Sequence, residues 1–160
     1  MVRLARAEDL PALIPVYDAA RRFMAEHGNP TQWAATGYPD RQDLEEDLAR
    51  KQLYVFEENG VLHGAFVLQF GEEPNYREID GAWLSDAPYG TIHRIASDGA
   101  VPGLFDACLA FCRERTGHLR IDTHENNAVM RHLITSRGFL PRGVIRVEDG
   151  TSRLAFEWVG

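Results

Sequence analysis

The sequence is short of cysteine, of long apolar runs and of net positive charge. Its 160 residues include two cysteines, Cys108 and Cys112, four positions apart in a helical pattern. That spacing indicates neither a disulfide nor a zinc site, so we expect two buried thiols in a reducing compartment and no bound metal. No apolar stretch approaches the roughly 20 residues that cross a bilayer, and residues 1–6 lack the apolar core of a signal peptide. We therefore expect a cytoplasmic protein without a membrane partner.

The charge balance is acidic. A net charge of −7 and a pI near 5.3 leave no basic footprint for nonspecific nucleic-acid binding, so we expect no nucleic-acid partner. The same acidity is compatible with a positively charged substrate such as an amine. With 44% hydrophobic and 26% charged residues, the length fits one folded domain, 1–160. A homodimer is compatible with these numbers.

The first half of the chain predicts strands and helices in alternation. Apolar residues recur at helical spacing over 8–26 and again over 41–50, where Asp40 is the expected N-cap and Asp43 the matching acidic residue. Asn59-Gly60 is a strong hairpin signal between two apolar runs. Gly64 interrupts the second of these runs and indicates a bulge. The predicted strands of this half are 2–5, 53–56 and 61–70.

The second half contains a strand, a glycine loop, a helix, a strand, a polar break and another helix. The two strands are predicted at 92–97 and 119–124, and such a unit places them in parallel. A hairpin around Asp149-Gly150 follows, with strands at 144–148 and 153–158. The predicted fold class is α/β (α+β), with a mixed, mostly antiparallel sheet of six to seven strands and about four helices.

The order of these elements resembles the GNAT (N-acetyltransferase) superfamily over essentially the whole chain. The most specific match is the segment 127–139, which resembles that family's N-x-x-A-x-x-L-Y-x-x-x-G-F at the same spacing from Asn127 to Gly138-Phe139. His93-Arg94-Ile95-Ala96 is similar to the family's fourth strand, which leads into its cofactor loop.

The resemblance implies transfer of an acetyl group from acetyl-CoA to the amine of a small molecule or peptide. In the family the fourth and fifth strands splay apart, the pantetheine arm pairs with the fourth strand, and the pyrophosphate lies on amides at the start of the next helix. A helix N-terminus favours an anion, and glycine permits close approach of the backbone. The cofactor-binding residues implied are Ile95, Ala96, Ser97, Asp98, Gly99, Val101, Pro102, Gly103, Leu104, Asn127 and Met130.

Two positions depart from the family's pattern. The family's loop reads Q/R-x-x-G-x-G/A, and the best alignment here gives Ala100, Gly103 and Phe105. The family also often has a tyrosine that protonates the leaving thiolate, where this chain has Ile134, which cannot donate a proton. The departures keep open a non-catalytic CoA-binding or ligand-sensing module on the same fold, and also a loop that no longer binds CoA.

The candidate catalytic residues are His124, His93 and Glu78. Either imidazole could take a proton from an ammonium substrate or relay it, and Glu78 could bind an amine or act as a base through water. Structural roles for all three remain open.

Charges and aromatic side chains complete the candidate set. Charged residues on central strands should be paired, and we expect Arg94 to pair with Asp122 and Arg120 to belong to the same structural ion cluster. The aromatic residues of two loops either shape the acceptor pocket or anchor the edge of the core. These candidate substrate-binding residues are Trp33, Tyr38, Tyr76, Trp83 and Tyr89.

Overall fold

The computed structural model describes residues 1–30, 32–33 and 37–160, which form two compact units. Unit 1 comprises Met1–Leu68 and His93–Phe111, and unit 2 comprises Gln69–Ile92 and Cys112–Gly160. Strand β5, Gly90–Ser97, contributes its first residues to unit 2 and the rest to unit 1. The predicted fold class, mixed α/β with four helices and a mostly antiparallel sheet, is confirmed.

Unit 1 holds the N-terminal half of the sheet. Its strands hydrogen-bond in the order β1-β2-β3-β5, and the first two pairings are antiparallel. The elements lie close to their predicted bounds. They are β1 Val2–Leu4, a 3-10 turn Ala7–Asp9, α1 Leu10–Glu26, α2 Arg41–Ala49, β2 Leu53–Glu58, β3 Val61–Phe70 and the start of α3, Leu104–Arg113.

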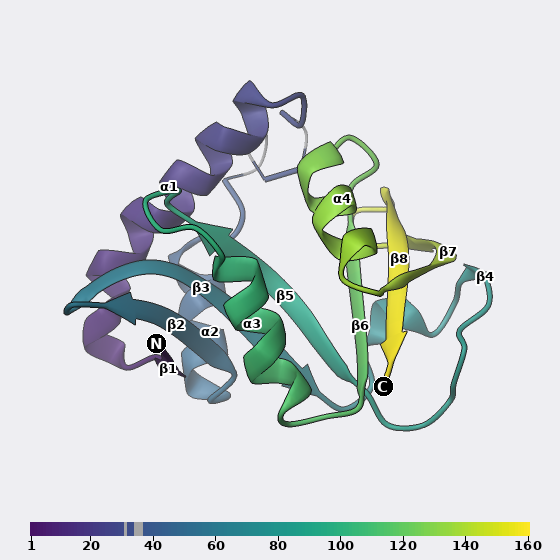
Figure 1. Ribbon diagram of the computed structural model, residues 1–160. Coiled ribbons are helices and arrows are strands. Elements are labelled where there is room, and N and C mark those ends of the chain that lie inside the picture. Colours follow the sequence, from purple (N-terminus) through teal and green to yellow (C-terminus); the bar gives the residue numbers. More distant parts are fainter. Residues whose placement is uncertain (31, 34–36) are drawn as a thin grey trace. The chain divides into compact units, whose positions relative to one another are not determined.

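Successive side chains of β2 point to opposite faces of this half-sheet, and each face is covered by other parts of unit 1. Leu53 and Val55 are fully buried in the apolar cluster that includes the inner faces of α1 and α2. Tyr54 points the other way and contacts Phe66 and Phe111, with ring centroids 5.5 and 4.7 Å apart. Helix α3 accordingly covers one face of these strands, and α1 and α2 cover the other (Figure 1).

The expected bulge near Gly64 is present. The β2–β3 register shifts between Phe56 and Glu57, opposite this glycine. A Cβ added at Gly64 would lie 2.8 Å from the Ala96 carbonyl oxygen and 2.9 Å from Leu104 Cδ1. Only glycine therefore lets β3 approach both β5 and the first residue of α3.

Helix α2 is capped as predicted and ends abruptly. Asp40 accepts a hydrogen bond from the Asp43 N–H, and Asp43 accepts one from the Asp40 N–H, both at 2.9 Å. After Ala49 the chain turns through Lys51, whose φ is +55° and whose N–H donates to the Leu48 carbonyl. Lys51 is exposed at this turn.

Unit 2 holds the C-terminal half of the sheet, in the order β5-β6-β8-β7-β4. The β5–β6 ladder is parallel, as predicted, through the pairs Gly90–Leu119 and Thr91–Arg120, and the other pairings are antiparallel. The elements are a 3-10 turn Pro74–Tyr76, β4 Asp80–Gly81, β6 His118–Thr123, α4 Ala128–Ser136, β7 Leu140–Arg146 and β8 Ser152–Val159.

Strand β4 is an eighth strand that the sequence did not indicate. Its two residues pair with β7 through Asp80–Val144 and Gly81–Gly143. Both glycines have positive φ, +136° and +149°, and a Cβ on either would lie about 2 Å from a backbone oxygen of the other strand. Among the described residues no helix is long and apolar enough to cross a membrane.

Candidate functional site

The backbone of β5 is held in an unusual conformation at Arg94. Its φ is +48°, which a non-glycine residue rarely adopts inside a strand. The guanidinium donates to both carboxylate oxygens of Asp47, at 2.7 and 2.6 Å, and Asp47 is 2% exposed. Tyr17 donates its hydroxyl to the Arg94 carbonyl at 2.7 Å. The side chain and the carbonyl of Arg94 are thus both fixed, and so is the start of the segment expected to pair with pantetheine.

The loop after β5 is closed by side chains that bond to nearby backbone. Asp98 accepts from the Ala100 N–H at 2.9 Å, and its other carboxylate oxygen lies 2.8 Å from Nδ1 of His63 on β3. The Asp98 N–H in turn donates to the His63 carbonyl at 2.9 Å. Ser97 accepts from the Gly99 N–H at 3.0 Å. These bonds fix the path of the chain between β5 and α3.

Two glycines of this loop leave open space at its surface. Gly99 and Gly103 both have φ +80°, and a Cβ on either would meet nothing within 4 Å. Helix α3 begins directly afterwards, so the amides of its first turn have no partner inside the helix. Phe105, which stands where the family has a small residue, is 7% exposed. Its ring is buried and does not occupy the space beside the glycines.

In unit 2, the polar face of β6 carries a buried charge cluster. Arg120 lies between the rings of Trp83 and Tyr89, 4.0 Å from each centroid, and donates to Glu157 at 3.3 Å. Glu157 is 0% exposed, and it also contacts His118 Nε2 at 2.5 Å. The expected structural ion cluster therefore exists around Arg120, with Glu157 of β8 as its centre.

The partner expected for Arg94 was Asp122. Arg94 pairs with Asp47 in its own unit, whereas Asp122 accepts a hydrogen bond from the Tyr76 hydroxyl at 2.7 Å. Burial and the neighbouring Asp122 carboxylate raise the pKa of Tyr76 well above its usual value. Tyr76 is consequently a hydrogen-bond donor at any physiological pH.

His124 lies just after β6 and is half-buried. Its Nδ1 accepts from the Asn126 N–H at 3.0 Å, so the imidazole carries its proton on Nε2 when neutral. Burial, then the nearby Arg153 guanidinium, lowers the pKa of His124, which favours the neutral form at pH 7. Neutral imidazole is the form that accepts a proton.

The other catalytic candidates have different surroundings. His93 belongs to unit 1 and is half-buried, whereas Glu78 belongs to unit 2 and is exposed. Their catalytic roles stay predictions.

The aromatic candidates for substrate binding contact one another and neighbouring side chains. In unit 1, Trp33 is 7% exposed and lies against Tyr38, whose hydroxyl contacts Arg94 at 2.5 Å. In unit 2, Tyr76 is 2% exposed and contacts the rings of Trp83 and Tyr89. These contacts fit the anchoring alternative, and the acceptor-binding role stays a prediction.

Helix α4 begins at Asn127, whose side-chain oxygen accepts from the Met130 N–H at 3.1 Å. Both CoA candidates of this unit, Asn127 and Met130, therefore lie at the start of the helix. Asn127 is 9% exposed and Met130 is half-buried. Ile134, at the position of the family's tyrosine, is 0% exposed.

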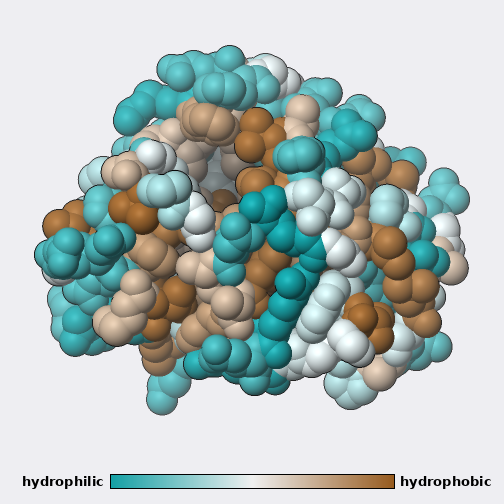
Figure 2. Space-filling view, viewed as in Figure 1, coloured by the Kyte–Doolittle hydropathy of each residue, from teal (hydrophilic) through white to brown (hydrophobic). Residues whose placement is uncertain are grey.

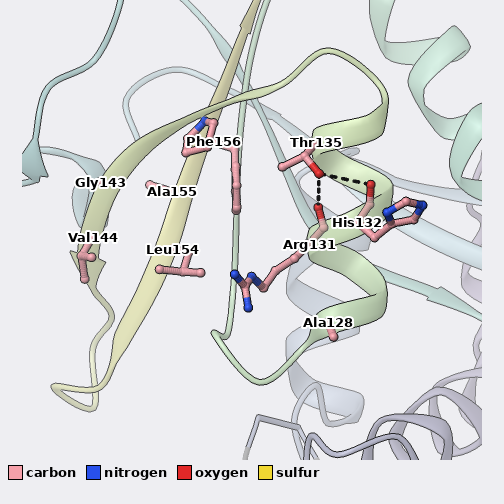
Figure 3. Close-up of a pocket in the computed structure, with 10 residues that line it drawn as sticks. Ala128, Arg131, His132, Thr135, Gly143, Val144, Leu154, Ala155 and Phe156 are labelled. Carbon is pink, nitrogen blue, oxygen red and sulfur yellow. Dashed lines mark hydrogen bonds between the residues drawn. The ribbon is translucent and has the colours of Figure 1, made fainter.

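A cavity of about 510 Å³ opens on another side of α4 (Figure 3). It lies between α4 and the β7–β8 hairpin, all within unit 2. The lining residues are Ala128, Arg131, His132 and Thr135 of the helix, and Pro141, Gly143, Val144, Leu154, Ala155 and Phe156 of the hairpin. Sequence reasoning did not identify this cavity, because it depends on how the hairpin packs beside the helix.

Other residues that shape these sites were also missed. Asp47 falls between Leu44 and Leu48 on the apolar side of α2, and that position in an otherwise buried stripe was a readable signal. Glu157 follows the buried Phe156 on β8, but nothing in the local sequence distinguishes it from a surface acid. Among the described residues, no group of three or more His, Cys, Asp or Glu side chains could hold a metal ion.

Comparisons with known proteins place these features in a family. No family model matches the chain, and no curated protein does. Among solved structures, a GNAT-family acetyltransferase from Streptococcus agalactiae 2603 is 30% identical, with a TM-score of 0.90 over 100% of this chain and 95% of that chain. One from Listeria monocytogenes 4b F2365 is 19% identical, with a TM-score of 0.74 over 100% and 94%.

A third structure contains coenzyme A. It is the PaiA N-acetyltransferase of Thermoplasma acidophilum in complex with coenzyme A, 14% identical, with a TM-score of 0.66 over 100% of this chain and 98% of that chain. At that identity the likeness concerns the fold alone. The likeness to the streptococcal protein extends over the whole chain in both sequence and structure, and this chain belongs to the GNAT family of acetyltransferases.

Proposed function

We propose that the protein is an N-acetyltransferase that moves an acetyl group from acetyl-CoA to the amine of a small molecule or peptide. The observation that carries the proposal is the loop of residues 98–103 between β5 and α3. It combines two glycines with open space beside them and a helix N-terminus, which together suit a pyrophosphate. The CoA-bound structure of the Thermoplasma acidophilum protein supports the same choice of donor.

The residues present fit such an anion without cationic side chains. Residues 98–107 contain no lysine or arginine, so backbone amides and the helix dipole would supply the attraction. The one carboxylate at the loop's start, Asp98, is turned to His63 and the Ala100 N–H. Gly99 and Gly103 would let the phosphates approach the backbone closely, while Ile95, Ala96 and Ser97 of β5 would pair with the pantetheine arm.

The chemistry proposed is direct attack. The neutral amine nitrogen forms a bond to the thioester carbonyl carbon, the carbon–sulfur bond breaks, and the thiolate leaves. The N–H groups of β5 after Arg94 would polarise the carbonyl. His124, neutral at pH 7 because its pKa is lowered, is our candidate to accept the amine's proton. Ile134 cannot donate a proton, so water or another side chain would protonate the thiolate.

One observation favours a second candidate, a CoA-binding sensor without catalysis. Ile134 is fully buried where the family often has its proton-donating tyrosine. The two functions separate in a single assay, because a sensor binds CoA but releases no thiol from acetyl-CoA with any amine.

The test combines binding and turnover. Affinity for CoA is measured by calorimetry, and thiol release from acetyl-CoA is followed with a panel of amines and amino-terminal peptides. Gly103→Glu should abolish CoA binding, because it places bulk and negative charge where the pyrophosphate would lie. Gly60→Glu is the matched control: Gly60 has φ +79° and open space as well, but it lies in the β2–β3 hairpin.

Three results would count against parts of this proposal. Equal CoA affinity of wild type and Gly103→Glu would refute the placement of the pyrophosphate. CoA binding without thiol release with any amine would refute the enzyme function and favour the CoA-binding sensor. Failure of CoA to raise the melting temperature of the wild type at high excess would refute both functions.

A further inference from the structure

The cavity beside α4 has the size of a small-molecule site. Its volume of about 510 Å³ falls in the range of roughly 300–1,000 Å³ that ligand pockets occupy. All its lining residues belong to α4, β7 and β8, and Asn127 and Met130, the two residues of this unit assigned to CoA, are not among them. It is therefore separate from the α4 positions assigned to CoA.

The floor of the cavity is apolar. Pro141 and Val144 of β7 and Leu154 and Phe156 of β8 line it, and no charged residue of the hairpin does. Hydrophobic side chains also reach the surface over β7 and β8 at the right of Figure 2. An apolar ligand body would find contact area here, and burying it would be favourable.

The polar part of the cavity comes from α4. Arg131 extends from the helix toward Leu154 of β8 (Figure 3), and its guanidinium donates a hydrogen bond to the Glu125 carbonyl at 3.1 Å. Among the residues that the structure describes, no carboxylate pairs with this guanidinium. The Thr135 hydroxyl is already bonded within the helix, to the Arg131 carbonyl at 2.9 Å. Arg131 is thus the cation available to a ligand.

The segment that forms the cavity differs in the sign of its net charge from the whole chain. Residues 128–160 contain five arginines and three acidic residues, a net charge of +2, whereas the whole chain carries −7. One of the three acidic residues, Glu157, is fully buried against His118 and Arg120. The surface of this segment consequently attracts anions.

We propose that this cavity binds a small amphipathic carboxylate, with its apolar body on the β7–β8 floor and its carboxylate paired with Arg131. A guanidinium suits a carboxylate because it can donate two parallel hydrogen bonds. The site goes beyond the acetyl-transfer function and does not depend on it.

Decanoate is the probe, with decanol and decylamine as neutral and cationic controls, and calorimetry or ligand-observed NMR as the readout on the intact protein. We expect decanoate to bind with a dissociation constant of about 1 mM or below, and both controls to bind far more weakly. Arg131→Gln should weaken decanoate binding about tenfold or more. Arg146→Gln removes an exposed arginine of β7 that does not line the cavity, and it should change little.

A second pair of variants tests the location by filling space. Ala128→Trp introduces a large ring at an exposed lining position and should block binding, whereas Val129→Trp, at the adjacent exposed position outside the lining, should not. The proposal is overturned by equal binding of decanoate and decanol. It is also overturned if Arg131→Gln binds like the wild type, or if the two tryptophan variants behave alike.

Discussion

Buried charges in both units are satisfied by partners far away in the sequence. Arg94 and Asp47 are 47 residues apart, and His118 and Glu157 are 39 apart. Leaving either partner of such a pair alone costs about 3–5 kcal/mol, so each pair constrains which elements pack together. In unit 1 the constraint also fixes the left-handed φ of Arg94, and with it the strand expected to hold the acyl donor.

His63 should support phosphate binding through Asp98. Replacing it by phenylalanine removes the Nδ1 contact to the Asp98 carboxylate, and the loop then loses one of its fixed turns. We expect roughly 3- to 10-fold weaker CoA binding, in line with one hydrogen bond. His63→Asn keeps an N–H close to the Nδ1 position and should restore most of the affinity.

Pantetheine distinguishes this role from general loss of structure. It lacks the pyrophosphate, so His63→Phe should bind pantetheine as well as the wild type does. If pantetheine and CoA lose affinity equally, His63 supports the fold rather than the phosphate loop.

His124 should make stability depend on pH. Its pKa is lowered in the folded state, so the unfolded chain, with a histidine pKa near 6.5, takes up the proton more readily. The contribution of neutral His124 to the free energy of unfolding is therefore fully present above about pH 6.5, and it is lost as the pH falls toward the pKa of His124 in the folded protein. Urea unfolding at pH 7.5 and 5.0 should show a smaller loss of stability for His124→Gln than for the wild type. Equal losses would contradict the shift.

For single residues, the sequence predicted that buried charged side chains are paired, but it did not predict which pairs form. Arg94 and Asp122 belong to strands that were expected to be neighbours, and that expectation suggested Asp122 as the partner of Arg94. The helix α2 supplies Asp47 instead, and such a contact follows from tertiary packing rather than from any local pattern.

Among the elements, α4 combines a structural and a proposed binding role at its first turn. Asn127 caps the helix through the Met130 N–H and is also a proposed CoA contact. Asn127→Ala should lower the free energy of unfolding by about 1 kcal/mol, whereas Asn127→Ser keeps a capping oxygen and should lose little.

Chemical denaturation and CoA titration of both variants separate the two roles. Serine restoring stability but not CoA affinity would assign Asn127 a direct contact with the donor. Serine restoring both would leave the cap as its whole function.

Most elements were predictable because their signals are local. Asp40 with Asp43, Asn59-Gly60 and the periodicity of α1 and α3 each arise within a few residues, and the structure has all of them. Strand β4 was missed because two residues carry no periodicity. It exists through Gly81 and Gly143, whose close backbone approach is visible only once both strands are placed.

For the whole molecule, the family resemblance predicts a donor loop but no acceptor. The loop is read from glycines and a following helix, which are sequence features. The cavity beside α4 and the cluster around Glu157 depend on contacts between segments far apart in the chain, so neither could be read from the sequence.

The turn after α2 also matters for anyone who assays this protein. Lys51, exposed there, is the only lysine of the chain, and the α-amino group of Met1 donates to the Glu57 carbonyl at 2.9 Å. Among the lysine and arginine side chains of this sequence, Lys51 alone can take an acetyl group on nitrogen from acetyl-CoA, because guanidinium groups stay protonated. Peptide mapping should place any acetyl mark on Lys51 first, and Lys51→Arg should remove it. A mark elsewhere in that variant, apart from Met1, would contradict this expectation.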